Sequence, residues 1–311
     1  MSGKDLWGTK IDKIVLLANK KAELQFQVFV RSLRDVGCNL PVWVIPFGKK
    51  DFEPPPGCQW IEDKDSKLLA FLRQNAAHPL YRKYMALLQN HCAYFDTDII
   101  LLREPQEWLR STPSDAFVVA DTEWAKNRWT FSADSLRFLT ALSSCWPLLT
   151  FNSGFFAFEE TLYEEEELLS VIQRPEFRST CVERKASPID QPAINWLVLR
   201  KQRRIFNFNL PPQGMESTMA VDYGAAQPKK VLSNPAAPPF IHYAGPVFEA
   251  GLPVTELFVS YLTKSERIRW DAELRKRRES RRWLEKWPLF IRVLNRLIRY
   301  TDPRFHVQPK L

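Results

Sequence analysis

The stretch that decides the fold begins with Ile14-Val15-Leu16-Leu17-Ala18, a short apolar run with lysine residues close to both ends. Such a continuous run is typical of a strand that is buried on both faces. A helical pattern follows and ends at Gly37, with apolar residues spaced by three and four: Phe26, Phe29, Val30 and Leu33. A second apolar run, Val42-Trp43-Val44-Ile45, lies between two prolines. A strand, a helix and a strand in this order predict an α/β fold with a doubly wound, mostly parallel central sheet.

Strand and helix patterns alternate through the rest of the chain. Further strands are predicted at 93–95, 99–102, 117–120 and 155–158, and helices at 66–75, 80–89, 159–173 and within 188–200. We expect a loop at 51–58, which has three consecutive prolines, and a connector at 225–239, which is rich in alanine and proline. These patterns predict one α/β domain over residues 1–262 and a basic, amphipathic, helical tail over 263–311.

Composition and charge narrow the class of protein. The chain has 311 residues, of which 45% are hydrophobic, and this excludes a disordered polymer. No apolar run is long enough to span a membrane, and residues 1–13 do not have the apolar core of a signal peptide. The five cysteines form no C-x-x-C pair, so we expect reduced thiols and a cytoplasmic location.

Two aspartates, Asp96 and Asp98, stand where one apolar strand ends and the next begins. On an extended chain they would point to opposite sides, so a turn at Thr97 is needed for both to reach one ion. Hard cations such as Mg²⁺ and Mn²⁺ prefer carboxylate oxygens and share their coordination with phosphates. The apolar neighbours would bury the pair, and buried carboxylates are costly unless a cation neutralises them. The pattern therefore favours a metal site, although two aspartates that cap a strand and face water fit the same letters.

Four motifs follow one another along the chain: Tyr94–Leu101, Phe151–Phe156, Asp190–Asn195 and Ile241–Pro246. Each is ambiguous alone, but four in this order and spacing are specific. Together they resemble the family 8-like glycosyltransferases, which have the A-type fold of the nucleotide-diphospho-sugar transferases. The resemblance covers residues 11–246. It implies that a sugar moves from a nucleotide-diphosphate sugar, a UDP-sugar by family habit, to a hydroxyl acceptor with retention of configuration.

The resemblance also implies roles for individual residues. Asp96, Asp98 and His242, the last in an H-x-x-G element, match the ligands of a Mn²⁺ or Mg²⁺ ion. Asp190 and Gln191 match a D-Q element beside the reacting carbon and are the expected catalytic residues. The expected donor-binding residues are Ala18, Asn19, Arg82, Asp96, Thr97, Asp121, Asn152, Ser153, Gly154 and Gly245, with Lys83 as the second choice after Arg82.

Several of these residues also fit a purely structural role. His242 could be a core histidine at a strand end, and Arg82 could lie on a solvated helix surface. Asp121 could simply end its strand, or it could bind donor-sugar hydroxyls or act as the base if the enzyme inverts configuration.

The sequence departs from the family after Gly245. Members commonly continue with a lysine that binds the diphosphate, whereas here Val247-Phe248-Glu249 follows. The diphosphate then depends more on the metal and on Arg82. This departure leaves open an alternative, a catalytically reduced module that binds a sugar nucleotide or acts as a scaffold. A dehalogenase-type phosphohydrolase is disfavoured, because that family carries its D-x-D on the first strand, followed by Thr or Val.

The net charge of +8 is concentrated in the segment 264–299, which has thirteen Lys or Arg residues and five Asp or Glu residues. A basic tail on a neutral body predicts an anionic partner surface. Residues 289–300 form an apolar helical stripe beside arginines, which favours a peripheral membrane anchor on the inner face of the membrane over packing on the catalytic domain. Nucleic acid is disfavoured, because no aromatic-studded sheet motif accompanies the basic residues. The acceptor stays open between a carbohydrate, a lipid-linked molecule and a protein.

Overall fold

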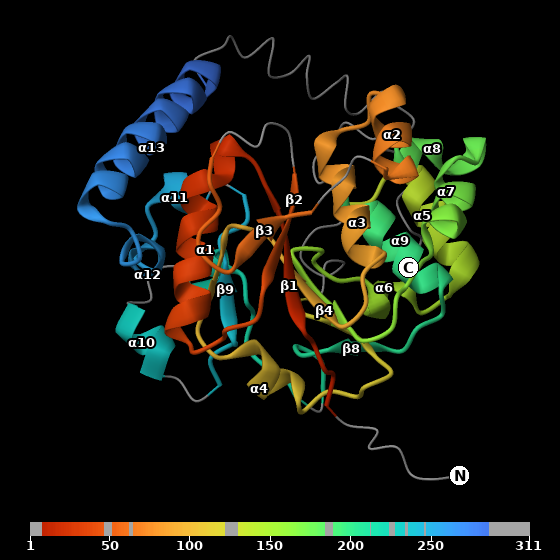
Figure 1. Cartoon of the computed structure of the whole chain (residues 1–311), viewed down its shortest axis with the longest axis horizontal. Helices are drawn as coiled ribbons and strands as arrows, with labels where there is room; N and C mark the ends of the chain where they lie inside the picture. The colour runs from red at the N-terminus through yellow and green to blue at the C-terminus, as the bar shows by residue number, and fades with distance from the viewer. Residues whose placement is uncertain are drawn as a thin grey trace.

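The computed structural model describes residues 8–46, 52–61, 65–121, 130–183, 189–211, 213–223, 228–233, 236–245 and 247–285. Its centre is a seven-stranded sheet with the strand order β3-β2-β1-β4-β7-β6-β8 (Figure 1). The strands are β1 Lys13–Ala18, β2 Val42–Pro46, β3 Cys58–Trp60, β4 Cys92–Phe95, β6 Phe117–Val119, β7 Phe155–Phe158 and β8 Ile205–Asn207. A separate pair is formed by β5 Ile99–Leu101 and β9 Phe240–His242.

The first half of the sheet is parallel, as the sequence predicts. β1 pairs in parallel with both β2 and β4, and β2 pairs in parallel with β3. All six residues of β1 are buried. Val15 and Leu17 pack into the apolar cluster on one face of the sheet, and Ile14 and Leu16 pack into the cluster on the other face. This two-sided burial explains why the run is continuously apolar.

The second half of the sheet reverses direction at β7. This strand is antiparallel to β4 and to β6, whereas β6 and β8 are parallel to each other. The sheet is therefore mostly parallel, with one strand inserted in the opposite sense. The loop predicted at 51–58 ends in β3, an edge strand that the proline-rich pattern concealed.

Helices cover both faces of the sheet (Figure 1). The α-helices are α1 Glu23–Asp35, α2 Lys67–Gln74, α3 Tyr84–Leu87, α4 Pro105–Leu109, α5 Ala133–Leu142, α6 Trp146–Leu149, α7 Glu165–Ile172, α8 Arg178–Cys181, α9 Gln191–Arg200, α10 Pro228–Ser233, α11 Val247–Ala250, α12 Thr255–Val259 and α13 Lys264–Glu285. The short 3-10 helices are η1 Lys20–Ala22, η2 Pro79–Lys83, η3 Pro175–Phe177 and η4 Ala220–Tyr223.

Two helix predictions and one connector prediction differ from the structure. The helix predicted at 80–89 is a 3-10 turn, η2, followed by the short α3. The helix predicted from residue 159 begins only at Glu165, because the preceding residues form turns and bends. The connector predicted at 225–239 contains α10 in its described part.

A third apolar cluster joins α13 to the body of the protein. Trp270 of α13 is 1% exposed and packs with Phe248 and Phe258. The helix begins with a capping box, in which Thr263 N donates to Glu266 Oε2 at 2.8 Å and Glu266 N donates to Thr263 Oγ1 at 3.3 Å. Arg31 of α1 forms two hydrogen bonds with the same glutamate, at 2.6 and 2.8 Å.

The first turns of α13 are therefore anchored to the body of the protein, and the domain boundary after residue 262 stays a prediction. None of the described helices is long and apolar enough to cross a membrane. The apolar stripe predicted at 289–300 lies outside the described residues.

Candidate active site

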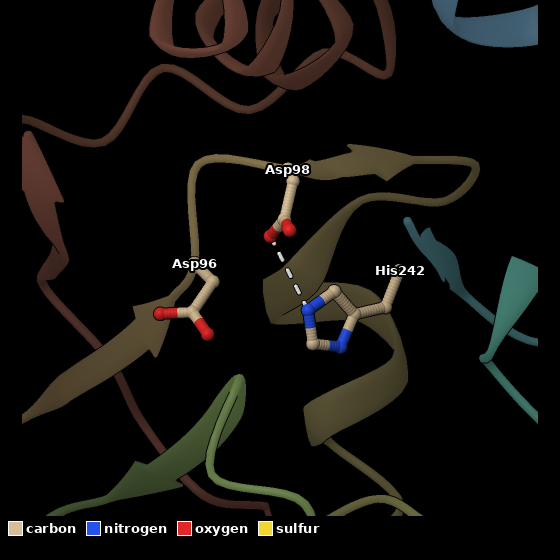
Figure 2. A group of neighbouring side chains, drawn as sticks. All are labelled: Asp96, Asp98 and His242. Carbon is tan, nitrogen blue, oxygen red and sulfur yellow. Dashed lines mark ion pairs between the residues drawn. The ribbon is translucent and has the colours of Figure 1, made fainter. Parts of the chain in front are cut away.

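The candidate metal ligands meet where β4 ends and β5 begins. Asp96 directly follows β4, Asp98 directly precedes β5, and a turn joins them through Thr97. β9 pairs with β5 in the register Ile99 opposite His242, which brings the histidine beside Asp98. Figure 2 shows the three side chains converging, and one ligand atom of each lies within 4.8 Å of the other two. The turn that two aspartates need in order to face one ion is thus present.

The buried His242 and the partly exposed Asp98 form a pair, with Nε2 3.2 Å from Oδ1 (Figure 2). Burial opposes charge on the imidazole, but the surrounding carboxylates, Asp98 foremost, together outweigh it and raise the pKa of His242. Burial also opposes charge on Asp98, but His242, a backbone hydrogen bond and Lys83 together outweigh it and lower the pKa of this carboxyl. Two carboxylates and an imidazole are a donor set that suits Mn²⁺, and a histidine binds a metal through its neutral ring. These residues therefore fit a divalent cation.

Lys83 is a buried cation that joins the D-x-D pair to the D-Q element. Its side chain is 2% exposed, and Nζ lies 2.6 Å from Asp190 Oδ2 and 3.1 Å from Asp96 Oδ1. Nζ also donates to the carbonyl oxygen of Ser153 at 3.1 Å. Burial opposes the charge, but Asp190 and Asp96 together outweigh it and raise the pKa of the lysine. Lys83 therefore stays protonated and holds the two carboxylates a fixed distance apart.

The D-Q element begins α9 and faces the loop before β7. Ser153 Oγ donates to Asp190 Oδ2 at 3.2 Å, and Ser153 N lies 3.4 Å from its acceptor, Gln191 Oε1. Asn195, one turn along α9, exchanges two hydrogen bonds with the backbone of Phe151, at 2.8 and 2.9 Å. The side-chain amide nitrogen of Gln191 is buried and has no hydrogen-bond acceptor in the described part of the chain. A donor group that is left unpaired in this way is free to bind a ligand oxygen.

Gly154 allows the loop to pass directly over the imidazole. A Cβ at this position would lie only 2.8 Å from His242 Nδ1, closer than real Cβ contacts permit. The carbonyl of Gly154 accepts a hydrogen bond from Asp96 N at 2.8 Å, and its own N–H donates to Asn152 Oδ1 at 2.8 Å. The Asn-Ser-Gly motif therefore packs against two of the three candidate metal ligands.

Asp121 lies in the left-handed region, with φ 57°, at the end of β6. Its carboxylate accepts hydrogen bonds from Ser217 Oγ at 3.1 Å and from Thr218 N at 3.2 Å, and also from Thr218 Oγ1. The carbonyl of Thr218 in turn accepts a hydrogen bond from His242 N at 2.8 Å. In this structure Asp121 therefore fixes the segment that supports the histidine, and its predicted role toward the donor stays a prediction.

The basic residue that contacts the carboxylates is Lys83, the second choice in the sequence. Arg82 instead donates from Nη1 to the carbonyl oxygen of Pro46, at the end of β2, at 2.6 Å. Arg82 thus lies at the carboxyl edge of the sheet, and its contact with donor phosphates stays a prediction. The sequence signal that could have identified Lys83 is its position between two tyrosines, Tyr81 and Tyr84. Both tyrosines are fully buried in the structure.

The remaining predicted residues lie at strand ends or turns. Ala18 ends β1, and Asn19 caps η1 by accepting a hydrogen bond from Ala22 N at 3.0 Å. Because β1 and β4 are parallel neighbours, these residues share a sheet edge with Asp96. Thr97 is buried in its turn. Gly245 has φ 72°, a conformation that favours glycine, three residues after His242.

Comparison with solved structures shows which known fold this chain shares. Over 90% of its length, the chain superposes on the bifunctional glycosyltransferase WbbM with a TM-score of 0.52, at 14% identity. The chain has the A-type fold of glycosyltransferases. It covers 53% of WbbM.

Two further glycosyltransferases are more distant in structure. GlyE from Streptococcus pneumoniae TIGR4 gives a TM-score of 0.47 at 13% identity, with 86% of this chain and 63% of GlyE covered. The galactosyltransferase LgtC, solved with donor and acceptor sugar analogues, gives 0.42 at 13% identity, with 81% of this chain and 96% of LgtC covered. No protein-family model and no curated protein sequence matches the chain.

Proposed function

We propose that this protein is a metal-dependent glycosyltransferase that uses a nucleotide-diphosphate sugar, with a UDP-sugar as the donor. The observation that supports this most strongly is the juxtaposition of two groups at one sheet edge. The candidate metal cluster of Asp96, Asp98 and His242 lies directly beside the D-Q element, and Lys83 bridges the two. The carboxyl ends of the strands in open α/β sheets are also where ligands of this kind bind.

Each group has a distinct role in this proposal. Asp96, Asp98 and His242 would hold a Mn²⁺ or Mg²⁺ ion, which supplies positive charge against the departing nucleoside diphosphate. Gln191 offers its unpaired amide N–H to the donor sugar or diphosphate. Asp190 lies beside it and would face the positive charge that develops at the reacting carbon when configuration is retained.

This chain lacks the lysine that commonly follows Gly245 in the family 8-like glycosyltransferases that it resembles. Val247 and Phe248 are buried in the third apolar cluster, so this stretch serves packing and not phosphate binding. The cation and the carboxyl-edge residues must then hold the diphosphate. This favours a strict requirement for metal in donor binding, both for an enzyme and for the alternative of a non-catalytic sugar-nucleotide module.

The first experiment measures UDP binding by calorimetry with Mn²⁺ and with EDTA. Asp98→Asn should lose the Mn²⁺-dependent binding, because the substitution removes one ligand charge while keeping the shape of the side chain. Asp115→Asn is the matched control, since Asp115 is an exposed partner of Arg204 away from the site. Equally strong UDP binding in EDTA and in Mn²⁺ would falsify the metal role. Release of free sugar from a donor panel with Mn²⁺ then distinguishes an enzyme from a binding module.

A further inference from the structure

A cavity is lined by residues of α13 and of the segment that holds the two short helices α11 and α12. These helices lie on the side of the protein that carries α1 (Figure 1). Its volume is about 400 Å³, which is within the range of small-molecule sites. None of the candidate metal, donor-binding or catalytic residues described above lines it. The cavity is therefore separate from the candidate active site.

The floor of this cavity is apolar and includes one unpaired donor. Phe248, Leu252, Val259 and Leu274 line it together with Trp270, which is 1% exposed. The indole N–H of Trp270 has no hydrogen-bond acceptor in the described ranges. A buried N–H without an acceptor is costly, and a ligand that supplies an oxygen would remove that cost.

The rim of the cavity is rich in arginine. Arg267 lies 3.6 Å from Glu256, and Arg278 donates to the backbone carbonyl of Glu249 at 3.0 Å. Arg275 also lines the cavity and forms no hydrogen bond or ion pair with the described residues. Glu256 and Asp271 are the two acidic residues in the lining, so its net charge is +1.

We propose that this cavity binds an amphiphile with an apolar chain and a phosphate monoester head. The apolar floor would take the chain, and Arg275 with the indole N–H of Trp270 would bind the phosphate oxygens. A guanidinium presents several N–H groups in a planar fork that matches phosphate geometry. A phosphate monoester has three acceptor oxygens and carries more than one negative charge at neutral pH, so it satisfies more of these donors than a carboxylate does.

The test is calorimetric titration of the full chain with dodecyl phosphate below its micelle concentration. Arg275→Glu should weaken binding by about tenfold or more, as expected when a charge-assisted hydrogen bond is lost. Lys276→Glu is the matched control, because it changes the net charge equally at the adjacent residue, which does not line the cavity. Binding to this control should stay within about twofold of the natural chain, as for a solvated surface charge.

Two further measurements identify the group that is recognised. Inorganic phosphate and neutral dodecyl maltoside should each bind far more weakly than dodecyl phosphate, since each supplies only half of the ligand. In a nitrogen–proton NMR spectrum, the indole signal that disappears in Trp270→Phe should shift on binding to the natural chain. Equal losses in the two charge variants would show diffuse attraction and overturn the site. Equal affinity for inorganic phosphate, or no saturable binding, would overturn it as well.

Discussion

Replacing Lys83 by methionine tests the central electrostatic feature of the site. The lysine is 2% exposed and lies between Asp190, whose side chain is 8% exposed, and Asp96, at 29%. Methionine has a similar length and keeps the packing, so the main loss is the positive charge. Removing one partner of a buried pair costs about 3–5 kcal/mol, and water can reach part of Asp96, so we expect about 3 kcal/mol.

The assay is urea unfolding followed by circular dichroism, in EDTA. The pKa of Lys83 is raised, so its stabilising charge is fully present below its unfolded-state pKa and is lost only as the pH rises through the higher folded-state value. The part of the free energy of unfolding that Lys83→Met loses with the lysine charge should therefore be the same at mildly acidic and neutral pH. Mn²⁺ should stabilise the variant more than the natural chain, because it restores positive charge beside Asp96.

Lys67→Met is the control for this experiment. Lys67 pairs with Glu166 on the surface, where the two side chains are 66% and 70% exposed. Surface pairs of this kind contribute about 0–1 kcal/mol, so the control should unfold almost like the natural chain. The reasoning is refuted if Lys83→Met loses no more stability than Lys67→Met does.

Three further predictions concern single positions. Asp190→Asn should keep donor affinity within a few-fold but lower donor turnover about a hundredfold, or about 3 kcal/mol, and an unchanged rate of sugar release would remove Asp190 from the chemical step. Gly154→Ala should weaken Mn²⁺ binding and cost about 1–3 kcal/mol of stability, because its Cβ meets the His242 ring; a Mn²⁺ titration that matches the natural chain would contradict this contact. Glu266→Gln should lower the free energy of unfolding by about 1 kcal/mol at neutral pH, since exposure weakens the pair with Arg31. The pKa of Glu266 is lowered from 4.5 to about 2, so its contribution is present above pH 4.5 and disappears as the pH falls towards 2; a difference from Glu266→Gln that persists below that range would argue against the ion pair.

Local patterns predicted much of the fold because burial leaves a direct trace in the sequence. β1 is buried on both faces and is therefore an unbroken apolar run, and the spacing of Phe26 and Phe29 marks the side of α1 that packs into the sheet cluster. The direction of β7 leaves no such trace. Phe155–Phe158 is equally apolar in both directions, so only the pairing with β4 and β6 shows that the strand runs antiparallel to its neighbours.

The site was predicted less completely, because two of its contacts depend on backbone geometry. Whether Arg82 or Lys83 points toward the carboxylates depends on the 3-10 conformation of η2. In a 3-10 helix each residue turns by a third of a turn, which is more than in an α-helix. Asp121 and Thr218 are 97 residues apart in the chain, and no periodic pattern connects them. Motif order located the candidate metal ligands and the D-Q element, but it could not show which residues support them.

The strand pair β5–β9 would give an ion at the candidate metal site a mechanical role. Asp96 directly follows a strand of the main sheet, whereas Asp98 directly precedes β5 and His242 ends β9, the two strands of the separate ribbon. An ion bound by all three residues would link the two-stranded ribbon to the main sheet. The ribbon is followed along the chain by α11 and the rest of the C-terminal segment. Removal of the ion by a chelator would then lower the local stability of the C-terminal third of the chain. Proteases should cut there first, while the parallel half of the sheet stays intact.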